Sequence, residues 1–482
     1  MTRPTRRDFL RSGLVAGAAL AVPRSSLMAA GANDAIRLGF IGCGGRGGQL
    51  MRQFSNIEGV RVAGMCDSDA SRVRSTHERF PQAKTWIDLR EMLDDPEIDA
   101  VVIASSIHWH SLATIWSVEA GKDVYCEKPM SHNHWEGRQA VAAVEQSGRI
   151  CQHGTQQRSD PMQAEIREFL HEEKALGAIR LARVNRYGIR PSIGRRDTPL
   201  PIPDHIDYDL WLGPAQDEPI FRDNLQYDWH WDWNTGTGEM GNWGVHVLDD
   251  LRMNILLDEP VLPRRICGGG GRVVFDDAGQ TPNVHFVFFD TGTIPVVIGL
   301  SNLPAEPGSN RPAPHPGPGS GHIAYCEGGR LEGQRGRAVA FDADGEEIRR
   351  FSGNGGEQIH QQNFIEALRQ RDASLLNSPI RIGSDTTSWC HVANIMVRAG
   401  DRFSRARAEQ VPDDFGLWDR LLTEMEEHLA AHGIDIESDA IRFTPLLEID
   451  PDTERFVGDH AQAANGFLRR EYREPFVVPE VA

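Results

Sequence analysis

A glycine-rich loop near the start of the chain has the spacing of a phosphate-binding turn. It reads Gly42-Cys43-Gly44-Gly45-Arg46-Gly47, a match to G-x-G-x-x-G, between the strand-like run 36–41 and the helical pattern 48–54. In such a loop the first glycine permits a tight turn, the second lets the backbone approach a pyrophosphate, and the third lets helix and strand pack closely. We therefore expect a dinucleotide at the helix N-terminus, bound by Gly42, Gly44, Gly45, Arg46 and Gly47.

An acidic residue, Asp67, follows the second strand-like run, 60–66, at a distance of 20 positions from Gly47. A carboxylate there can accept hydrogen bonds from ribose hydroxyls and would repel a 2′-phosphate. We therefore expect NAD rather than NADP, although Arg72 and Arg74 leave an opening for NADP. The alternative is a glycine-rich turn near a solvent-exposed aspartate.

A lysine follows the apolar run 123–126, in the sequence Glu127-Lys128-Pro129. Open α/β sheets bind their ligands at the carboxyl ends of parallel strands. A lysine that is partly desolvated there could have a lowered pKa and exchange a proton with a substrate hydroxyl while a hydride moves. From the spacing alone, an ordinary surface lysine in a tight turn is the preferred interpretation.

The elements that would position these residues alternate along the first third of the chain. Helical patterns separate five apolar runs, which predict parallel strands at 36–41, 60–66, 100–104, 123–126 and 149–153. We therefore expect a doubly wound Rossmann domain over residues 33–155.

The remainder predicts a second α/β domain with an open, mainly antiparallel sheet over residues 156–405. Its strand-like runs are 178–187, 261–275, 283–289 and 294–300, and its helical patterns are 161–173, 357–370 and 384–400. An acidic C-terminal extension, residues 406–482, contains one further helical pattern at 415–432.

Composition excludes several classes of protein. The 482 residues are 40% hydrophobic and 25% charged, which is typical of a globular protein with two or three cores. The formal net charge of −18 would repel a nucleic-acid backbone, so no nucleic-acid partner is expected. The seven cysteines include four in or beside apolar runs and show no zinc spacing, so we expect buried thiols and no metal site.

The first 32 residues resemble a twin-arginine export signal. The pair Arg6-Arg7 precedes Phe9-Leu10, and the apolar stretch 14–22 is too short to cross a bilayer. We therefore expect a periplasmic or otherwise exported protein whose mature chain has no membrane span. The alternative is a disordered basic tail.

Together, these motifs resemble those of the Gfo/Idh/MocA oxidoreductases. The resemblance is carried by the glycine loop, Asp67, the Glu-Lys-Pro turn and a later Gly-x-His-x-x-Asp segment at 244–249, and it covers about residues 35–400. It implies a tightly bound NAD, sugar or cyclitol substrates, and a homo-oligomer, a dimer or a tetramer, that forms through the open sheet. It also implies that Lys128 and His246 handle the proton.

The later segment places Asn242, His246, Asp249 and Asp250 on one face of a helix. Inositol-type members of the family have aspartate where this chain has Asn242. An amide cannot take a proton as a carboxylate does, so a full Lys-Asp-His relay is not expected. Asn242 would instead orient a hydroxyl, and Asp249 would contact the substrate.

The other candidates lie in an aromatic stretch and at strand ends. Trp229 and Trp231 suit the apolar faces of sugar rings, although packing of the insertion 188–235 explains them equally well. Arg158, with His153 and Gln156 close by in sequence, is a candidate substrate ligand. The expected cofactor contacts from strand ends are Ser105, His108, His110, Glu127, Lys128 and Pro129.

The leading hypothesis is an exported NAD-dependent oxidoreductase that acts on a sugar, glycoside or polyol. Because no free NAD pool is expected outside the cytoplasm, the cofactor would be retained and regenerated within the protein. An alternative is an NAD-dependent glycosidase or lyase that oxidises its sugar transiently. A second alternative is a non-catalytic carbohydrate-binding relative, which Asn242 would allow.

Overall fold

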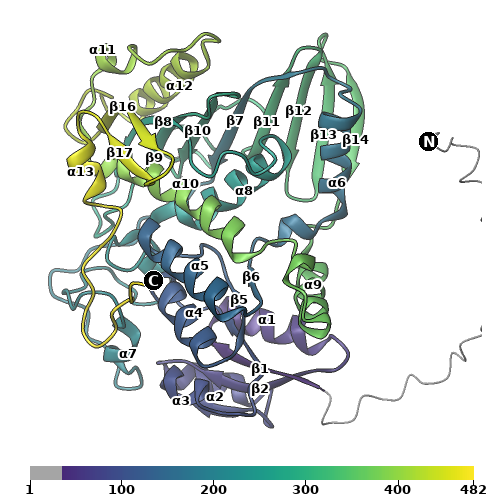
Figure 1. Ribbon diagram of the computed structural model, residues 1–482. Coiled ribbons are helices and arrows are strands. Elements are labelled where there is room, and N and C mark those ends of the chain that lie inside the picture. The colour runs from purple at the N-terminus through teal and green to yellow at the C-terminus, as the bar shows by residue number, and fades with distance from the viewer. Residues whose placement is uncertain (1–34, 482) are drawn as a thin grey trace, which may run out of the picture.

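The computed structural model describes residues 35–481, and the predicted export signal lies outside them. Its first part is a parallel sheet of six strands in the order β3-β2-β1-β4-β5-β6 (Figure 1). The strands are β1 (Ile36–Ile41), β2 (Val60–Cys66), β3 (Lys84–Trp86), β4 (Ala100–Ile103), β5 (Asp123–Cys126) and β6 (Cys151–His153). The helices are α1 (Gly45–Ser55), α2 (Ala70–His77), α3 (Leu89–Leu93), α4 (His110–Glu119) and α5 (His134–Ser147). The predicted Rossmann fold is confirmed.

Burial explains which strands the sequence reveals. Every residue of β4 is fully buried, because helices cover both faces of the sheet, and such a strand is a continuous apolar run. The edge strand β3, by contrast, consists of Lys84, Thr85 and Trp86, two of them exposed, so no apolar run marks it.

The second part is a mainly antiparallel sheet of eleven strands, and only β7 and β10 pair in parallel. Along its main path the order is β14-β13-β12-β11-β7-β10-β9-β8-β16-β15, and β17 (Arg455–Val457) pairs with β16. The central strands are β7 (Ile179–Tyr187), β8 (Arg265–Gly271), β9 (Val284–Asp290) and β10 (Val296–Ser301). The outer strands are β11 (Ser320–Cys326), β12 (Gly329–Gln334), β13 (Arg337–Asp342), β14 (Glu347–Ser352), β15 (Asp401–Arg402) and β16 (Arg442–Asp450). The predicted open, mainly antiparallel α/β domain is confirmed.

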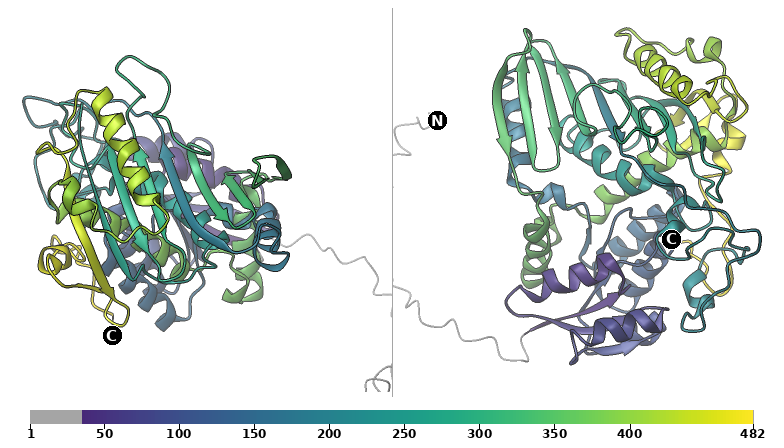
Figure 2. Two further views of the ribbon diagram at one scale, coloured as in Figure 1. Left: turned by 90° about the horizontal axis from the view of Figure 1, so that it is seen from above. Right: turned by 180° about the vertical axis from the view of Figure 1, so that it is seen from behind.

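Alternating side chains place two apolar cores on opposite faces of this sheet. Val184 and Ile298 face a core shared with α6 (Pro161–Arg167), α8 (Val245–Asn254) and α10 (Ile380–Arg398). Phe286 and Phe288 face the opposite core, which contains α12 (Leu417–Ala431). This helix lies across the sheet when the molecule is seen from above (Figure 2). Helix α12 therefore covers this face of the open sheet over β9 and β10, and the expected oligomer stays a prediction.

The expected boundary at residue 405 does not coincide with a break in the structure. Strand β16 pairs with β8, which places part of the acidic extension within the second sheet. The chain then returns to the Rossmann domain, where Phe476 packs 5.4 Å from the ring of Trp109. Helix α9 (Glu357–Gln370) also contacts this domain, through Phe364 and Phe54.

All seven cysteines lie within the described residues and are free, as expected from the apolar runs around four of them. No helix among residues 35–481 is long and apolar enough to cross a membrane.

Candidate active site

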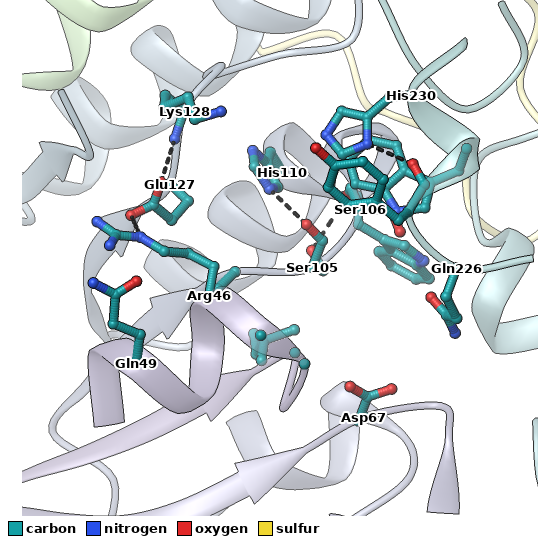
Figure 3. A pocket seen from close by; sticks show the side chains of 18 of the residues that line it. Arg46, Gln49, Asp67, Ser105, Ser106, His110, Glu127, Lys128, Gln226 and His230 are labelled. Atoms are coloured by element: carbon teal, nitrogen blue, oxygen red, sulfur yellow. Dashed lines mark hydrogen bonds and ion pairs between the residues drawn. The ribbon is translucent and has the colours of Figure 1, made fainter. Parts of the chain in front are cut away.

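A cavity of about 660 Å³ lies where the carboxyl ends of β1, β2, β4 and β5 meet the second domain (Figure 3). On the Rossmann side its walls include the glycine loop, Asp67, Ser105 and Lys128. The opposite side includes residues of the segment 226–246 and Arg335. The topology thus brings together residues from distant parts of the sequence.

The glycine loop forms a cradle that side chains would fill. Gly42 has a φ of +94°, and a Cβ there would lie 2.6 Å from the carbonyl oxygen of Ala104. A Cβ on Gly47 would lie 1.8 Å from the Gly42 oxygen, so Gly47 packs behind the loop. Gly44 caps α1 without a side-chain bond, which leaves first-turn amides available for an anion. Together with Gly45 and Arg46 in the cavity wall, this geometry fits a dinucleotide pyrophosphate.

Asp67 is held in place by the backbone at the end of β2. Its carboxylate accepts hydrogen bonds from the amides of Cys43 (2.8 Å) and Asp69 (2.9 Å). Burial raises the pKa of Asp67, and these two donors oppose that effect. Arg72 also lines the cavity and forms an ion pair with Asp69 at 3.6 Å. This end of the cavity therefore contains both a carboxylate and a guanidinium.

Two polar bridges join the strand ends around the loop. Arg46 Nε donates to Glu127 Oε1 at 2.7 Å, a contact drawn in Figure 3. His110 contacts the carbonyl oxygens of Ser105 (3.1 Å) and Pro129 (2.7 Å), and burial lowers its pKa. Glu127, Ser105 and His110 line the cavity, whereas Pro129 contributes its carbonyl to the bridge.

Lys128 is the partly buried amine of this site. Its Nζ donates to the backbone oxygen of Asn242 (2.9 Å) and to Oδ1 of the same residue (3.3 Å). Burial lowers the pKa of Lys128 to about 8, although the carboxylates of Glu127 and Glu239 act in the opposite direction. A large fraction of the amine is therefore neutral at mildly alkaline pH, as a proton acceptor requires.

A buried carboxylate orients the amide of Asn242. The Nδ2 of Asn242 donates to Glu239 Oε2 at 3.1 Å, so the Oδ1 of Asn242 faces Lys128. Glu239 has no exposed surface and forms ion pairs with Arg186 (2.6 Å) and Arg190 (3.3 Å). Position 242 has no carboxylate here, but Glu239 provides one that is a single hydrogen bond further from Lys128.

His246 lines the cavity one helical turn beyond Asn242. Burial lowers its pKa well below the usual range, and the charge of Lys128 adds to this effect. The ring packs edge-on against Trp243 at 5.6 Å, and its Nδ1 has no partner among the described residues. A neutral imidazole with a free nitrogen can orient a substrate hydroxyl or accept its proton.

Of the two predicted sugar-stacking residues, only Trp229 lines the cavity. Its ring stacks on His230 at 3.6 Å, and Tyr227 completes this aromatic wall. Trp231 is buried, and its carbonyl accepts a hydrogen bond from Gln280 N at 2.8 Å, so it supports the wall from behind.

Contrary to prediction, Arg158, Asp249 and His108 do not line the cavity. Arg158 donates to Asp249 Oδ2 at 2.8 Å and forms an ion pair with Asp258 at 2.7 Å. Both ring nitrogens of His108 contact carbonyl oxygens, those of Thr235 and Trp211. Arg158 and Asp249 thus satisfy each other, and backbone oxygens satisfy His108, so none of the three is available to a ligand.

Comparisons with known proteins agree with the geometry. Residues 36–155 match the oxidoreductase family NAD-binding Rossmann fold, GFO_IDH_MocA. Residues 193–294 match the C-terminal alpha/beta domain of the same family. Both of these domains belong to the Gfo/Idh/MocA oxidoreductase family.

Curated relatives share part of the chain. Inositol 2-dehydrogenase 2 of Saccharopolyspora erythraea is 33% identical over 153 residues, which are 31% of this chain and 45% of the relative. A glycosyl hydrolase family 109 protein of Solibacter usitatus is 28% identical over 176 residues, 31% of this chain and 39% of the relative. The chain thus spans less than half the length of these relatives.

Solved structures share the fold. The putative oxidoreductase yvaA of Bacillus subtilis has a TM-score of 0.55 at 17% identity, with 75% of this chain and 95% of that chain covered. The WlbA dehydrogenase of Bordetella pertussis, solved with NADH and UDP-GlcNAcA, has a TM-score of 0.53 at 16% identity, covering 73% and 93%.

Several residues of this Gfo/Idh/MocA site escaped the sequence analysis. Glu239 is three residues before Asn242, a spacing that places two side chains on one helix face and could have revealed it. Arg335, Glu357 and Gln49 carry no such signal, because they come from a hairpin turn and two helices that meet only in the fold.

Proposed function

We propose that this protein is an NAD-dependent oxidoreductase that oxidises a hydroxyl group of a sugar, glycoside or polyol. The observation that carries the proposal is that Lys128, a partly buried amine with a pKa lowered to about 8, lines the same cavity as the glycine loop and His246. Bound NAD would supply the hydride acceptor. Lys128 Nζ would take the hydroxyl proton, and the neutral His246 would orient the hydroxyl or share the proton.

The substrate class is supported by the cavity wall and by relatives. Trp229, Tyr227 and Trp243 present aromatic faces that suit the C–H faces of sugar and cyclitol rings. Inositol dehydrogenases from two organisms are among the relatives with 33% identity.

The test is purification, release and identification of the bound nucleotide, followed by incubation with a panel of sugars, glycosides and polyols. We expect NAD(H) in the released fraction and a rise in nicotinamide absorbance near 340 nm with at least one polyol or sugar, as for any NADH-forming reaction. Absence of a bound or bindable nucleotide would refute the proposal.

A glycosidase reaction with transient oxidation is the second candidate, because two glycosyl hydrolase family 109 proteins are 28% and 30% identical to part of the chain. In that reaction the hydride returns to the product, so no net NADH forms. Release of a free sugar from a glycoside without a lasting change in nicotinamide absorbance would favour this candidate over net oxidation.

We predict that Asp67→Ala shifts the preference from NAD toward NADP by roughly 10-fold or more, since each 1.4 kcal/mol changes an affinity ratio tenfold. The substitution removes the carboxylate that repels a 2′-phosphate and leaves Arg72 at the same end of the cavity. Dissociation constants for both nucleotides provide the measurement. Adding Arg72→Gln should cancel the gain, whereas Arg74→Gln, on an exposed residue outside the cavity wall, should not. Tighter binding of NADP than NAD by the unmodified protein would contradict the assignment.

Two substitutions should move the pH profile of oxidation in opposite directions. Asn242→Asp adds a negative charge beside Lys128 Nζ, so its pKa should rise and the midpoint should move up by about one pH unit. Glu239→Gln removes a charge that raises the pKa of Lys128, so the midpoint should move down. Thermal unfolding of both variants separates this effect from lost stability, because Glu239 also pairs with two arginines. Unchanged midpoints in both variants would remove Lys128 as the titrating group.

A further inference from the structure

Arg335 reaches the cavity from the second domain. It lies in the turn between β12 and β13, beside Gly336 with a φ of +69°. It lines the same cavity as Lys128 and His246. Burial is the main cause of the lowered pKa of each of these two residues, and the charge of Arg335 adds to it. The guanidinium therefore lies within electrostatic range of both proton-handling groups.

Neutral side chains hold this guanidinium. Its Nε donates to Gln157 Oε1 at 3.2 Å. The amide of Gln156, oriented so that its nitrogen donates to the Gly154 oxygen at 2.8 Å, accepts from Arg335 Nη2. Behind Gln157 lies Asp250, which accepts its amide proton and whose pKa burial raises well above the usual range. The groups that touch Arg335 directly are thus two neutral amides.

The other arginines of the cavity wall are neutralised. Arg46 forms ion pairs with Glu127 and Glu357, and Arg72 pairs with Asp69. Among residues 35–481, by contrast, no carboxylate lies within ion-pair distance of Arg335, and its Nη1 has no hydrogen-bond partner. A guanidinium that two amides orient, with a free edge and no ion-pair partner among the described residues, matches the planar geometry of a carboxylate.

We infer that the substrate is a sugar acid or a related polyhydroxy acid, whose carboxylate binds Arg335 while its reacting hydroxyl lies at Lys128. This inference rests on the proposed function and narrows its substrate class. Arg335 is exposed where it reaches the cavity, so beside a neutral sugar its charge would stay hydrated. An acid of the same ring would add a charge-assisted hydrogen bond to this guanidinium.

The test compares acids with their neutral counterparts on the NAD-loaded protein. Galacturonate against galactose and glucuronate against glucose are titrated by calorimetry, and NADH formation is followed separately. We expect at least one acid to bind roughly 10- to 100-fold more tightly than its partner, the range of a charge-assisted hydrogen bond. Arg335→Gln should remove this difference without weakening NAD or the neutral sugar, and Arg335→Lys should restore part of it. The control is Arg337→Gln, which changes an exposed arginine of the same hairpin outside the cavity wall and should have no effect.

Three outcomes overturn the inference: no acid binds, acid and neutral partners bind equally, or Arg335→Gln weakens NAD in place of the acid. If neutral sugars still reduce NAD in these cases, the proposed function stands without the acid preference. Arg335-dependent acid binding with no NADH and no cleaved glycoside from any ligand would support the carboxylate site and contradict the proposed reaction.

Discussion

Lys128→Met is expected to lower the turnover number by roughly 10²- to 10⁴-fold, the usual contribution of a positioned acid or base. Methionine is an unbranched apolar side chain that fits this partly buried position but cannot accept a proton. Binding of NAD should be retained, because the glycine loop and Asp67 do not depend on the amine. Steady-state oxidation, the dissociation constant of NAD and thermal unfolding are the measurements.

The rate of oxidation should also depend on pH in a definite direction. Oxidation needs the neutral amine, so the rate of the unmodified enzyme should rise with pH through a midpoint near 8. The residual rate of Lys128→Met should lack that midpoint. In the reducing direction the ammonium form donates the proton, so the rate should instead fall as pH rises through the same midpoint.

A second lysine provides the control. Lys122 is buried, and its ammonium donates to the carbonyl oxygens of Asp95 (2.8 Å) and Ile98 (2.9 Å), away from the cavity wall. Lys122→Met should lower thermal stability and leave turnover per folded molecule unchanged. Near-normal turnover in Lys128→Met would remove the lysine from the reaction.

Gly44→Val is expected to weaken NAD binding by roughly 100-fold, the upper end of what 1–3 kcal/mol of overpacking gives. The first side-chain carbon would already lie 2.9 Å from Arg72 Nη1 at the cavity wall, and the two methyl groups beyond it would occupy space near the first turn of α1. The fold should persist, because the obstructing atom is the end of a flexible arginine. Fluorescence or calorimetric titration with NAD measures the effect.

Gly48→Ala is the matched control on the same helix. The nearest atoms to its added carbon are 3.8 and 3.9 Å away, ordinary contact distances, so NAD affinity should not change. Alanine is also the better helix former. If Gly44→Val bound NAD normally, the glycine loop would not be the phosphate site.

The sequence by itself determined the features that depend on neighbours along the chain. Strands β4 and β5 and the last four residues of β1 are buried on both faces, so each is a largely apolar run. The glycine loop follows β1, and Glu127-Lys128 follows β5. The carboxyl ends of parallel strands necessarily meet at one edge, so the approximate place of the site followed from their order. Asn242 and His246 share a cavity wall because they are one helical turn apart.

Only the tertiary structure decided which charges remain available to a ligand. Arg158 and Asp249 are plausible ligands in sequence, yet they form a buried ion pair with each other across 91 positions. Arg335, in a polar hairpin, has no apolar pattern around it, yet the turn brings it to the same cavity as Lys128. Likewise, β16 joins the sheet through pairing with β8, about which local propensity carries no information. Long-range pairing and the mutual neutralisation of charges depend on distances in the folded chain, and sequence spacing does not encode them.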